Sequence, residues 1–429
     1  MPMQKARKTI KITGLAFGGN GVGRMDDNGK VVFVPLTAPG DEAVVEITAE
    51  KKRFAEGALK EIINASPERV EPSCRWYGAC GGCSWGHLTY NAQVDWKARI
   101  LEDTLRRLGG ISGVPFDEPA RSPAPFHYRC RARFHCADGH IGFYGARSRE
   151  VVPIDECPLL EERVNAAYAA IREAIASTDD RSVESVVIGA GAEGPAAAAL
   201  HVHGRQNPAL VKALARTEAI KGFEVRQAAS GKLISTHGTV ALASNISGVE
   251  IASGVSVFSQ ANRAQNRVLV DKVVEYAGLS GAERVVDLYC GCGNLSLPLA
   301  LRAGFVTGVE SEAAAVEYAK ANAARNMPGN TAFHAAGAAA WLERNVKALE
   351  KDGTDVIILD PPRDGEFDAA RTIARLRPSR VVYVSCAPPA LARDAGHLAL
   401  NGYRLTRAGL IDMFPQTYHV ESIVRLDRV

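Results

Sequence analysis

Long hydrophobic runs are missing from this sequence. No stretch of about 18 apolar residues occurs in its 429 positions, so we expect no membrane-spanning helix. The first residues, MPMQKARKTIKI, carry positive charge without an apolar segment behind them, so we expect no secretory signal and a cytoplasmic protein. Disulfides are rare in that reducing compartment, and the nine cysteines are therefore better candidates for metal binding or catalysis.

A large excess of one charge sign is also missing, because the formal net charge is only +3. The distribution is nevertheless uneven, since residues 121–149 hold six arginines and three histidines against the single Asp138. Within this stretch Arg129, Arg131 and Arg133 alternate, as they would on one face of a strand. Such a row can follow a phosphate backbone, or it can protect the solvated edge of a sheet, and the sequence favours neither.

The first 66 residues predict an all-β module. Short β-rich runs between residues 8 and 65 are separated by Gly, Asn, Asp and Pro, as in a barrel of five short strands that can bind oligonucleotides. We expect a central β-rich domain at 67–250 and an α/β catalytic domain at 251–429. Residues 91–110 are predicted to form an amphipathic helix that can pack on the catalytic domain.

Three cysteines lie close together in CRWYGACGGC (74–83), at a C-x5-C-x2-C spacing. This spacing indicates a zinc or an iron–sulfur site, because thiolates suit both, and the spacing alone favours zinc slightly. A fourth ligand has to come from one of the other six cysteines. Cys157 is followed by Pro158, as is the last cysteine of some iron–sulfur motifs.

From about residue 255, apolar strands alternate with helices, which is typical of a parallel sheet with helices on both faces. DLYCGCGNLSLPLA (287–300) has the pattern strand, glycine-rich turn and helix, and the next strand ends at Glu310, 23 residues after Asp287. A carboxylate there can accept hydrogen bonds from ribose hydroxyls. The loop lacks the third glycine of the dinucleotide fingerprint, and this absence favours S-adenosylmethionine (SAM) over NAD as the ligand. A site for another nucleotide is the alternative.

Ligands of such sheets bind beyond the carboxyl ends of the strands, where Asp360 and Cys386 also fall. Glu421 enters an apolar strand, and a carboxylate is costly to bury there unless it is paired or used. A thiol, a carboxylate and SAM together suit methylation of uracil at C5. The thiolate adds to C6, C5 attacks the methyl group, and a base removes the C5 proton. The target base must be unstacked to be reached.

The motifs resemble those of the class I SAM-dependent RNA uracil-5-methyltransferases, over nearly the whole chain. The matching segments are FSQAN (258–262), DLYCGCGNLSLPLA (287–300), ILDPPRDG (358–365), VSCAPPALARD (384–394) and HVESIVRL (419–426). The resemblance implies that Cys386 is the nucleophile and Glu421 the base. It also implies a cofactor site for SAM made by Gln260, Tyr289, Asn294, Glu310 and Asp360.

One branch of this family carries a [4Fe-4S] cluster on the same C-x5-C-x2-C spacing plus one distant cysteine. The resemblance therefore implies an iron–sulfur cluster, structural or RNA-positioning, on Cys74, Cys80, Cys83 and Cys157. The N-terminal module resembles a TRAM domain, an OB-like RNA binder. This composition resembles the 23S ribosomal RNA branch, whereas the tRNA branch is expected to lack both additions. The implied partner is RNA, foremost 23S rRNA, and no obligate protein partner is expected.

The sequence departs from the family at two places. Ala387 stands where members usually carry Asn after the nucleophile, and Gly337 where some contact SAM through Asn. The alternatives are the same chemistry on tRNA or on several rRNA uridines, and an iron–sulfur RNA-binding protein with a vestigial SAM site. Intact Cys386, Glu421 and Asp360 argue against the last. A further alternative is an amino-methyltransferase. Those enzymes place an aromatic residue directly after the two prolines of their motif, where this sequence has Arg363.

Overall fold

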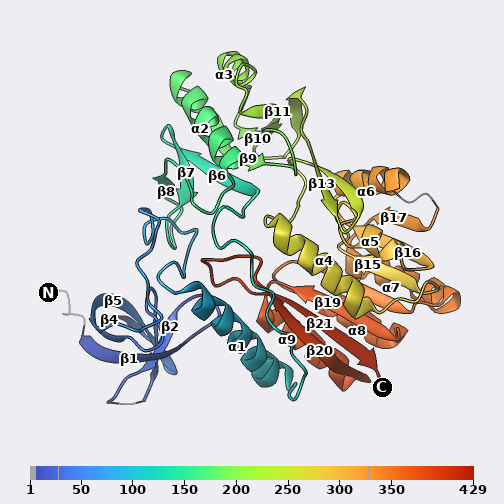
Figure 1. Cartoon of the computed structure of the whole chain (residues 1–429), viewed down its shortest axis with the longest axis horizontal. Helices are drawn as coiled ribbons and strands as arrows, with labels where there is room; N and C mark the ends of the chain where they lie inside the picture. Colours follow the sequence, from blue (N-terminus) through green and yellow to red (C-terminus); the bar gives the residue numbers. More distant parts are fainter. Residues whose placement is uncertain (1–5, 28, 327–328) are drawn as a thin grey trace.

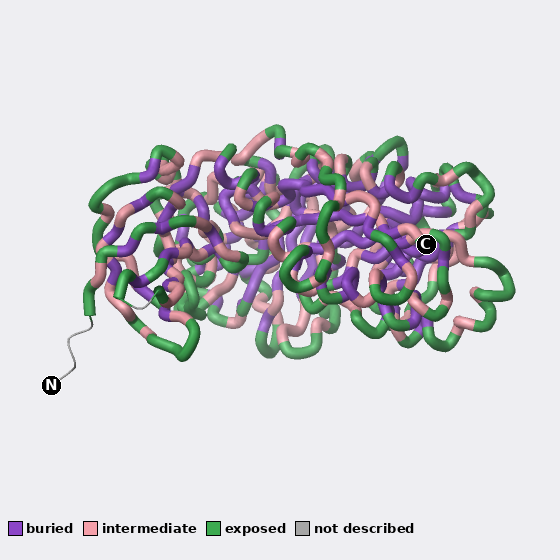
Figure 2. Tube along the Cα trace, turned by 90° about the horizontal axis from the view of Figure 1, so that it is seen from below, coloured by how far each residue is buried: buried purple, intermediate pink, exposed green. Residues whose placement is uncertain are grey.

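The computed structural model describes residues 6–27, 29–326 and 329–429 (Figure 1). Residues 1–5, which belong to the predicted N-terminal domain, lie outside this range. The chain forms a small barrel, a central sheet and a larger α/β sheet, and Figure 2 shows buried segments running through the middle of the elongated molecule. None of the helices in the described part has the length and apolar content needed to cross a bilayer.

The N-terminal barrel is closed, with strand order β1-β2-β3-β5-β4, which confirms the predicted five-stranded module. Its core holds alternate residues such as Ile10, Ile12, Val32 and Val45. Gly57 has no room for a side chain, because a Cβ there would lie 2.2 Å from Val45. The strands are β1 (Arg7–Leu15), β2 (Gly21–Arg24), β3 (Val31–Val34), β4 (Glu42–Glu50) and β5 (Phe54–Asn64).

The cysteine segment leads into α1 (Tyr90–Gly109), which starts at the cap residue Thr89 and ends at a left-handed Gly110. Helix α1 lies against α9 (Pro388–Leu400) of the large sheet, where a Cβ on Gly396 would be only 2.9 Å from the carbonyl oxygen of Gly109. Leu101 of α1 is buried in the same core as the large sheet. This helix is therefore part of the core of the large sheet although it precedes the central sheet in sequence.

The central sheet has the order β12-β11-β10-β9-β6-β7-β8. Strand β6 carries Arg131 and Arg133 and lies between β9 and β7, so the edge-strand alternative for the arginine row, which the sequence left open, does not hold. The elements are β6 (Arg131–Ala137), β7 (His140–Tyr144), β8 (Val151–Pro153), α2 (Glu162–Ser177), β9 (Val183–Gly189), β10 (Ala196–Val202), α3 (Pro208–Leu214), β11 (Ile220–Gln227) and β12 (Leu233–Gly238).

A separate hairpin, β13 (Ala241–Ile246) and β14 (Val249–Gly254), follows the central sheet. Its second strand is held to the large domain by asparagine side chains, since Asn322 Nδ2 donates to the carbonyl of Ala252 at 2.8 Å. Asn326 Nδ2 donates to the carbonyl of Glu250, also at 2.8 Å. The hairpin thereby closes one side of the region in front of the large sheet.

The large sheet has the order β17-β16-β15-β18-β19-β21-β20. The first five of these strands are parallel, as predicted, and β21 runs antiparallel to both of its neighbours. The order reverses between β15 and β18, which is where open α/β sheets bind ligands. Helix α5 is short, because the chain turns after Ala300 to enter β16.

The elements of this part are α4 (Arg263–Ala277), β15 (Arg284–Leu288), α5 (Ser296–Ala300), β16 (Phe305–Glu310), α6 (Ala313–Asn326), β17 (Thr331–Ala335), α7 (Ala338–Asp352), β18 (Val356–Leu359), α8 (Phe367–Leu376), β19 (Arg380–Ser385), α9 (Pro388–Leu400), β20 (Tyr403–Ile411) and β21 (Glu421–Arg428). The architecture is that of a Rossmann-like α/β sheet, which agrees with the fold predicted from the sequence.

Candidate active site

Three predicted site residues follow the carboxyl ends of neighbouring strands. Leu288 of β15 is in register with Val309 of β16 and with Leu359 of β18. The next residues, Tyr289, Glu310 and Asp360, therefore lie side by side at one edge of the sheet. The register of the parallel ladder brings together residues that are up to 71 positions apart.

The turn after β15 has a backbone that few residues adopt. Tyr289, Gly291 and Gly293 have φ angles of 69°, 53° and 89°. Such left-handed angles cost a non-glycine residue about 1–3 kcal/mol, and they cluster at ligand sites. The Glu310 carboxylate faces this turn and accepts hydrogen bonds from the backbone amides of Gly291, at 3.2 Å, and Glu312, at 2.8 Å. It is thus oriented by the loop that a nucleoside would approach.

One cavity is lined by Gln260, Tyr289, Asn294 and Asp360, which are four of the five residues predicted for SAM. The side chain of Asn294 is fixed by a pair of amide hydrogen bonds with Asn266, at 2.8 and 2.9 Å. Sequence reasoning missed Asn266, which also lines this cavity. Its signal was present in the sequence, because it follows the FSQAN segment by one helical turn.

Cys386 and Glu421 face each other across two antiparallel strands. The last pair of the ladder between β19 and β21 joins Ser385 with Ser422, so the next two residues, Cys386 and Glu421, are opposite each other. Burial raises the pKa of the Cys386 thiol to about 11, and the charges of Glu421 and Asp360 contribute. Burial and the charge of Asp360 also raise the pKa of the Glu421 carboxyl well above 4.5. The three acidic groups therefore form one cluster.

Two basic side chains border this cluster. The Arg363 guanidinium lowers the pKa of Cys386, opposing the carboxylates, and so favours the thiolate. His419 lies 3.5 Å from Arg363, between Nε2 and Nη2. Burial, followed by the charge of Arg363, lowers the pKa of His419 to about 4, so its imidazole is neutral at physiological pH.

Ala387 is buried at the start of α9 and provides no side-chain cap. Ser385 takes over part of that role, because its hydroxyl accepts a hydrogen bond from the Ala387 amide at 3.1 Å. Cys386 lies between these two residues, directly before the helix. The N-terminal end of a helix stabilises nearby negative charge, which also favours the thiolate.

A second cavity, of about 320 Å³, is lined by Cys74, Cys80, Cys83 and Cys157. Burial raises the pKa of Cys157 to about 11, and Cys80 and Cys74 raise it further. Burial likewise raises the pKa of Cys83, to which Cys157, Cys80 and Cys74 add. The four thiols thus line one space and influence one another. In residues 6–27, 29–326 and 329–429, no three His, Cys, Asp or Glu side chains are grouped closely enough to hold one metal ion.

Known proteins resemble this chain along nearly its whole length. The tRNA (uracil-5-)-methyltransferase family matches residues 89–429, and the TRAM domain family matches residues 3–60. The 23S rRNA (uracil(1939)-C(5))-methyltransferase RlmD of Alkalilimnicola ehrlichii is 35% identical, over 98% of this chain and 96% of that protein. RlmD of Methylococcus capsulatus is 35% identical over 97% of this chain and 96% of that protein.

A solved structure is similar as well. It is the tRNA (uracil-54, C5)-methyltransferase of Pyrococcus abyssi in complex with S-adenosyl-L-homocysteine. That structure has a TM-score of 0.76 and 26% identity, covering 98% of this chain and 100% of the other. The prediction that domain composition separates the rRNA from the tRNA branch is therefore wrong, because this tRNA enzyme matches the barrel too. The chain belongs to the SAM-dependent RNA uracil-5-methyltransferases and begins with a TRAM domain.

Proposed function

We propose that this protein methylates C5 of a uracil in RNA through a covalent adduct on Cys386. The observation that supports this most is the pair formed by Cys386 and Glu421 at the open end of β19 and β21, beside Asp360. A thiolate and a carboxylate on one site can act as nucleophile and base on the two adjacent carbons of a pyrimidine.

In the proposed reaction, Cys386 and Glu421 each have one task. The Cys386 sulfur forms a bond to C6, and the electron pair of the C5–C6 double bond becomes available at C5. SAM, when bound, supplies the methyl group that C5 takes. The Glu421 carboxylate then removes the C5 proton, the double bond re-forms, and the bond between sulfur and C6 breaks to return the thiolate. The raised pKa of Glu421 suits it to accept that proton.

The cofactor contacts are proposed for the cavity in front of β15. Glu310 would hold the ribose hydroxyls, since its carboxylate is already oriented by two backbone amides. Asn294, held by Asn266, and Gln260 would contact the rest of the molecule. Tyr289 donates its hydroxyl to Glu366, which fixes the ring at the entrance of the same cavity.

Cys74, Cys80, Cys83 and Cys157 are proposed to hold a [4Fe-4S] cluster. Four thiolates suit zinc and an iron–sulfur cluster alike, and the resemblance to the iron–sulfur branch of the family favours the cluster. A four-iron cluster spreads its thiolates around a larger volume, which suits four thiols that line a cavity of about 320 Å³. The chemistry on uracil needs no electron transfer, so the cluster would support the structure or the RNA contact.

The proposed substrate is 23S rRNA, on the strength of RlmD relatives that are 35% identical over nearly the whole chain. The test is release of tritium from C5 of uridine, with SAM and protein purified without oxygen. Unmodified 23S rRNA and tRNA are assayed separately. Release from 23S rRNA alone is the expected result. Release from tRNA alone would leave the chemistry and overturn the substrate, and release from neither, with SAM bound, would overturn the function.

A further inference from the structure

The segment 412–420 joins β20 to β21 and ends directly before Glu421. Ile411 and Glu421 pair across the two strands, so the segment leaves and re-enters the sheet at the same level. Glu421 is 3% exposed. It is the first residue of β21, so the conformation of the segment that enters the strand at this point helps to set the position of its carboxylate. Contacts that order the segment 412–420 therefore support the position of Glu421 in addition to its pairing with Ile411.

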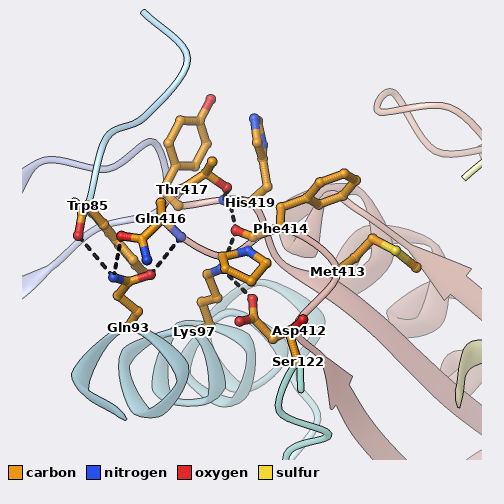
Figure 3. Close-up of polar contacts among 12 residues, drawn as sticks. Trp85, Gln93, Lys97, Ser122, Asp412, Met413, Phe414, Gln416, Thr417 and His419 are labelled. Carbon is orange, nitrogen blue, oxygen red and sulfur yellow. Dashed lines mark hydrogen bonds and ion pairs between the residues drawn. The ribbon is translucent and has the colours of Figure 1, made fainter. Parts of the chain in front are cut away.

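Gln93 of α1 binds this segment with both ends of its amide (Figure 3). Its Oε1 accepts from the Gln416 backbone amide at 2.8 Å, and its Nε2 donates to Gln416 Oε1 at 3.1 Å. Gln416 has a φ of 68°, a left-handed angle that a glutamine adopts only when its surroundings hold it there. Without Gln93, the backbone amide of Gln416 loses its hydrogen-bond acceptor.

Lys97 lies one turn further along α1 and reaches the same segment. Its ammonium group is 2.6 Å from Asp412 Oδ1 and donates to the carbonyl oxygen of Phe414 at 2.9 Å. Both charged side chains are fully buried. A buried ion pair adds little stability compared with apolar residues of the same size, because removing two charges from water is costly. The pair is better explained by the conformation that it specifies.

Other parts of the chain hold the segment too. The carbonyl oxygen of Gln416 accepts from the amides of Ser84 and Trp85, and Tyr128 donates its hydroxyl to the carbonyl oxygen of Pro415 at 3.1 Å. Helix α1 differs from these partners because its buried side chains contact the segment at both Asp412 and Gln416. Figure 3 shows Gln93 and Lys97 projecting from one face of α1 toward it.

From this arrangement we propose that Gln93 and Lys97 are positioning residues for Glu421, an inference that rests on the function proposed above. They act on the proton-abstraction step and leave the addition of Cys386 and the methyl transfer intact. Cys386 itself directly follows β19 and lies outside the segment. Loss of these residues should therefore stop the reaction after methylation, when the RNA is still covalently attached to Cys386.

The test uses Gln93→Leu and the double variant Lys97→Met/Asp412→Leu, which leaves no unpaired buried charge and so separates positioning from unfolding. Each full-length variant is given SAM and the RNA that the unaltered protein methylates. We expect C5 tritium release to slow at least tenfold, methylated RNA to remain attached to denatured protein, and SAM affinity to stay within twofold. Glu102→Gln, on the exposed side of α1, is the matched control and should behave as the unaltered protein.

The variant Glu421→Gln distinguishes a failure of the proposed function from a failure of the proposed positioning role. If the proposed function holds, this variant accumulates the methylated adduct; its failure to do so would overturn the function. If Glu421→Gln accumulates the adduct and the α1 variants do not, the positioning role is wrong. Unchanged tritium release in both α1 variants, or equal loss of adduct formation and release, would overturn it as well.

Discussion

The acidity of Cys386 gives the sharpest test of the site's electrostatics. Burial first, then Glu421 and Asp360, raise its pKa from the usual 9.0 to about 11, a difference of two units or about 2.7 kcal/mol. At pH 8 the thiolate fraction is then about a hundredfold smaller than for a thiol with the usual pKa. Alkylation of Cys386 by iodoacetamide should therefore rise about tenfold per pH unit up to a midpoint near 11.

Two substitutions should move this midpoint in opposite directions. Glu421→Gln removes a negative neighbour and lowers the pKa of Cys386, whereas Arg363→Gln removes a positive one and raises it. The readout is mass spectrometry of the tryptic peptide 381–393, in which Cys386 is the sole cysteine. Arg99→Gln, on the exposed side of α1, is the control for a general charge effect. A midpoint near 9 in the native protein, or shifts of the same sign, would refute the electrostatic reasoning.

Four further predictions concern separate parts of the molecule. Cys386→Ala should abolish methylation and covalent adducts while calorimetry still detects SAM binding. Glu310→Gln should weaken SAM by about 1.5–3 kcal/mol, because it removes a charged acceptor, again measured by calorimetry. Cys83→Ser should lower the iron and sulfide content per chain, whereas Cys136→Ser, outside the cavity, should not. Gly396→Ala should destabilise the packing of α1 on α9 by about 1–3 kcal/mol in urea unfolding, because its Cβ would lie 2.9 Å from a backbone oxygen.

Local sequence patterns were sufficient to predict the elements that carry the chemistry. The strand–turn–helix at 287–300 and the strands before Asp360 and Cys386 follow from apolar runs that end at glycine or proline. The register of a parallel sheet then placed Tyr289, Glu310 and Asp360 together. The individual roles of these residues, and the domain boundaries, stay predictions.

Contacts between distant parts of the chain could not be predicted. Lys97 and Asp412 are 315 positions apart, and no local pattern pairs a lysine on an amphipathic helix with one particular aspartate. The alternating arginines correctly predicted a strand. They could not predict its neighbours, because the pairing of β6 with β9 joins segments about 50 residues apart. The exposed-edge interpretation failed for that reason.

The segment 412–420 also affects how a loss of activity should be interpreted when the cluster proposed for the cysteine cavity is removed. Ser84 and Trp85 follow Cys83 directly, and both donate to the carbonyl oxygen of Gln416. Disorder of the cysteine segment would thus release the segment before Glu421 as well as any RNA contact made nearby. Lower activity after removal of a cluster therefore does not identify a defect in RNA binding. A defect in RNA binding lowers adduct and product together, whereas a displaced Glu421 lowers product and preserves the adduct.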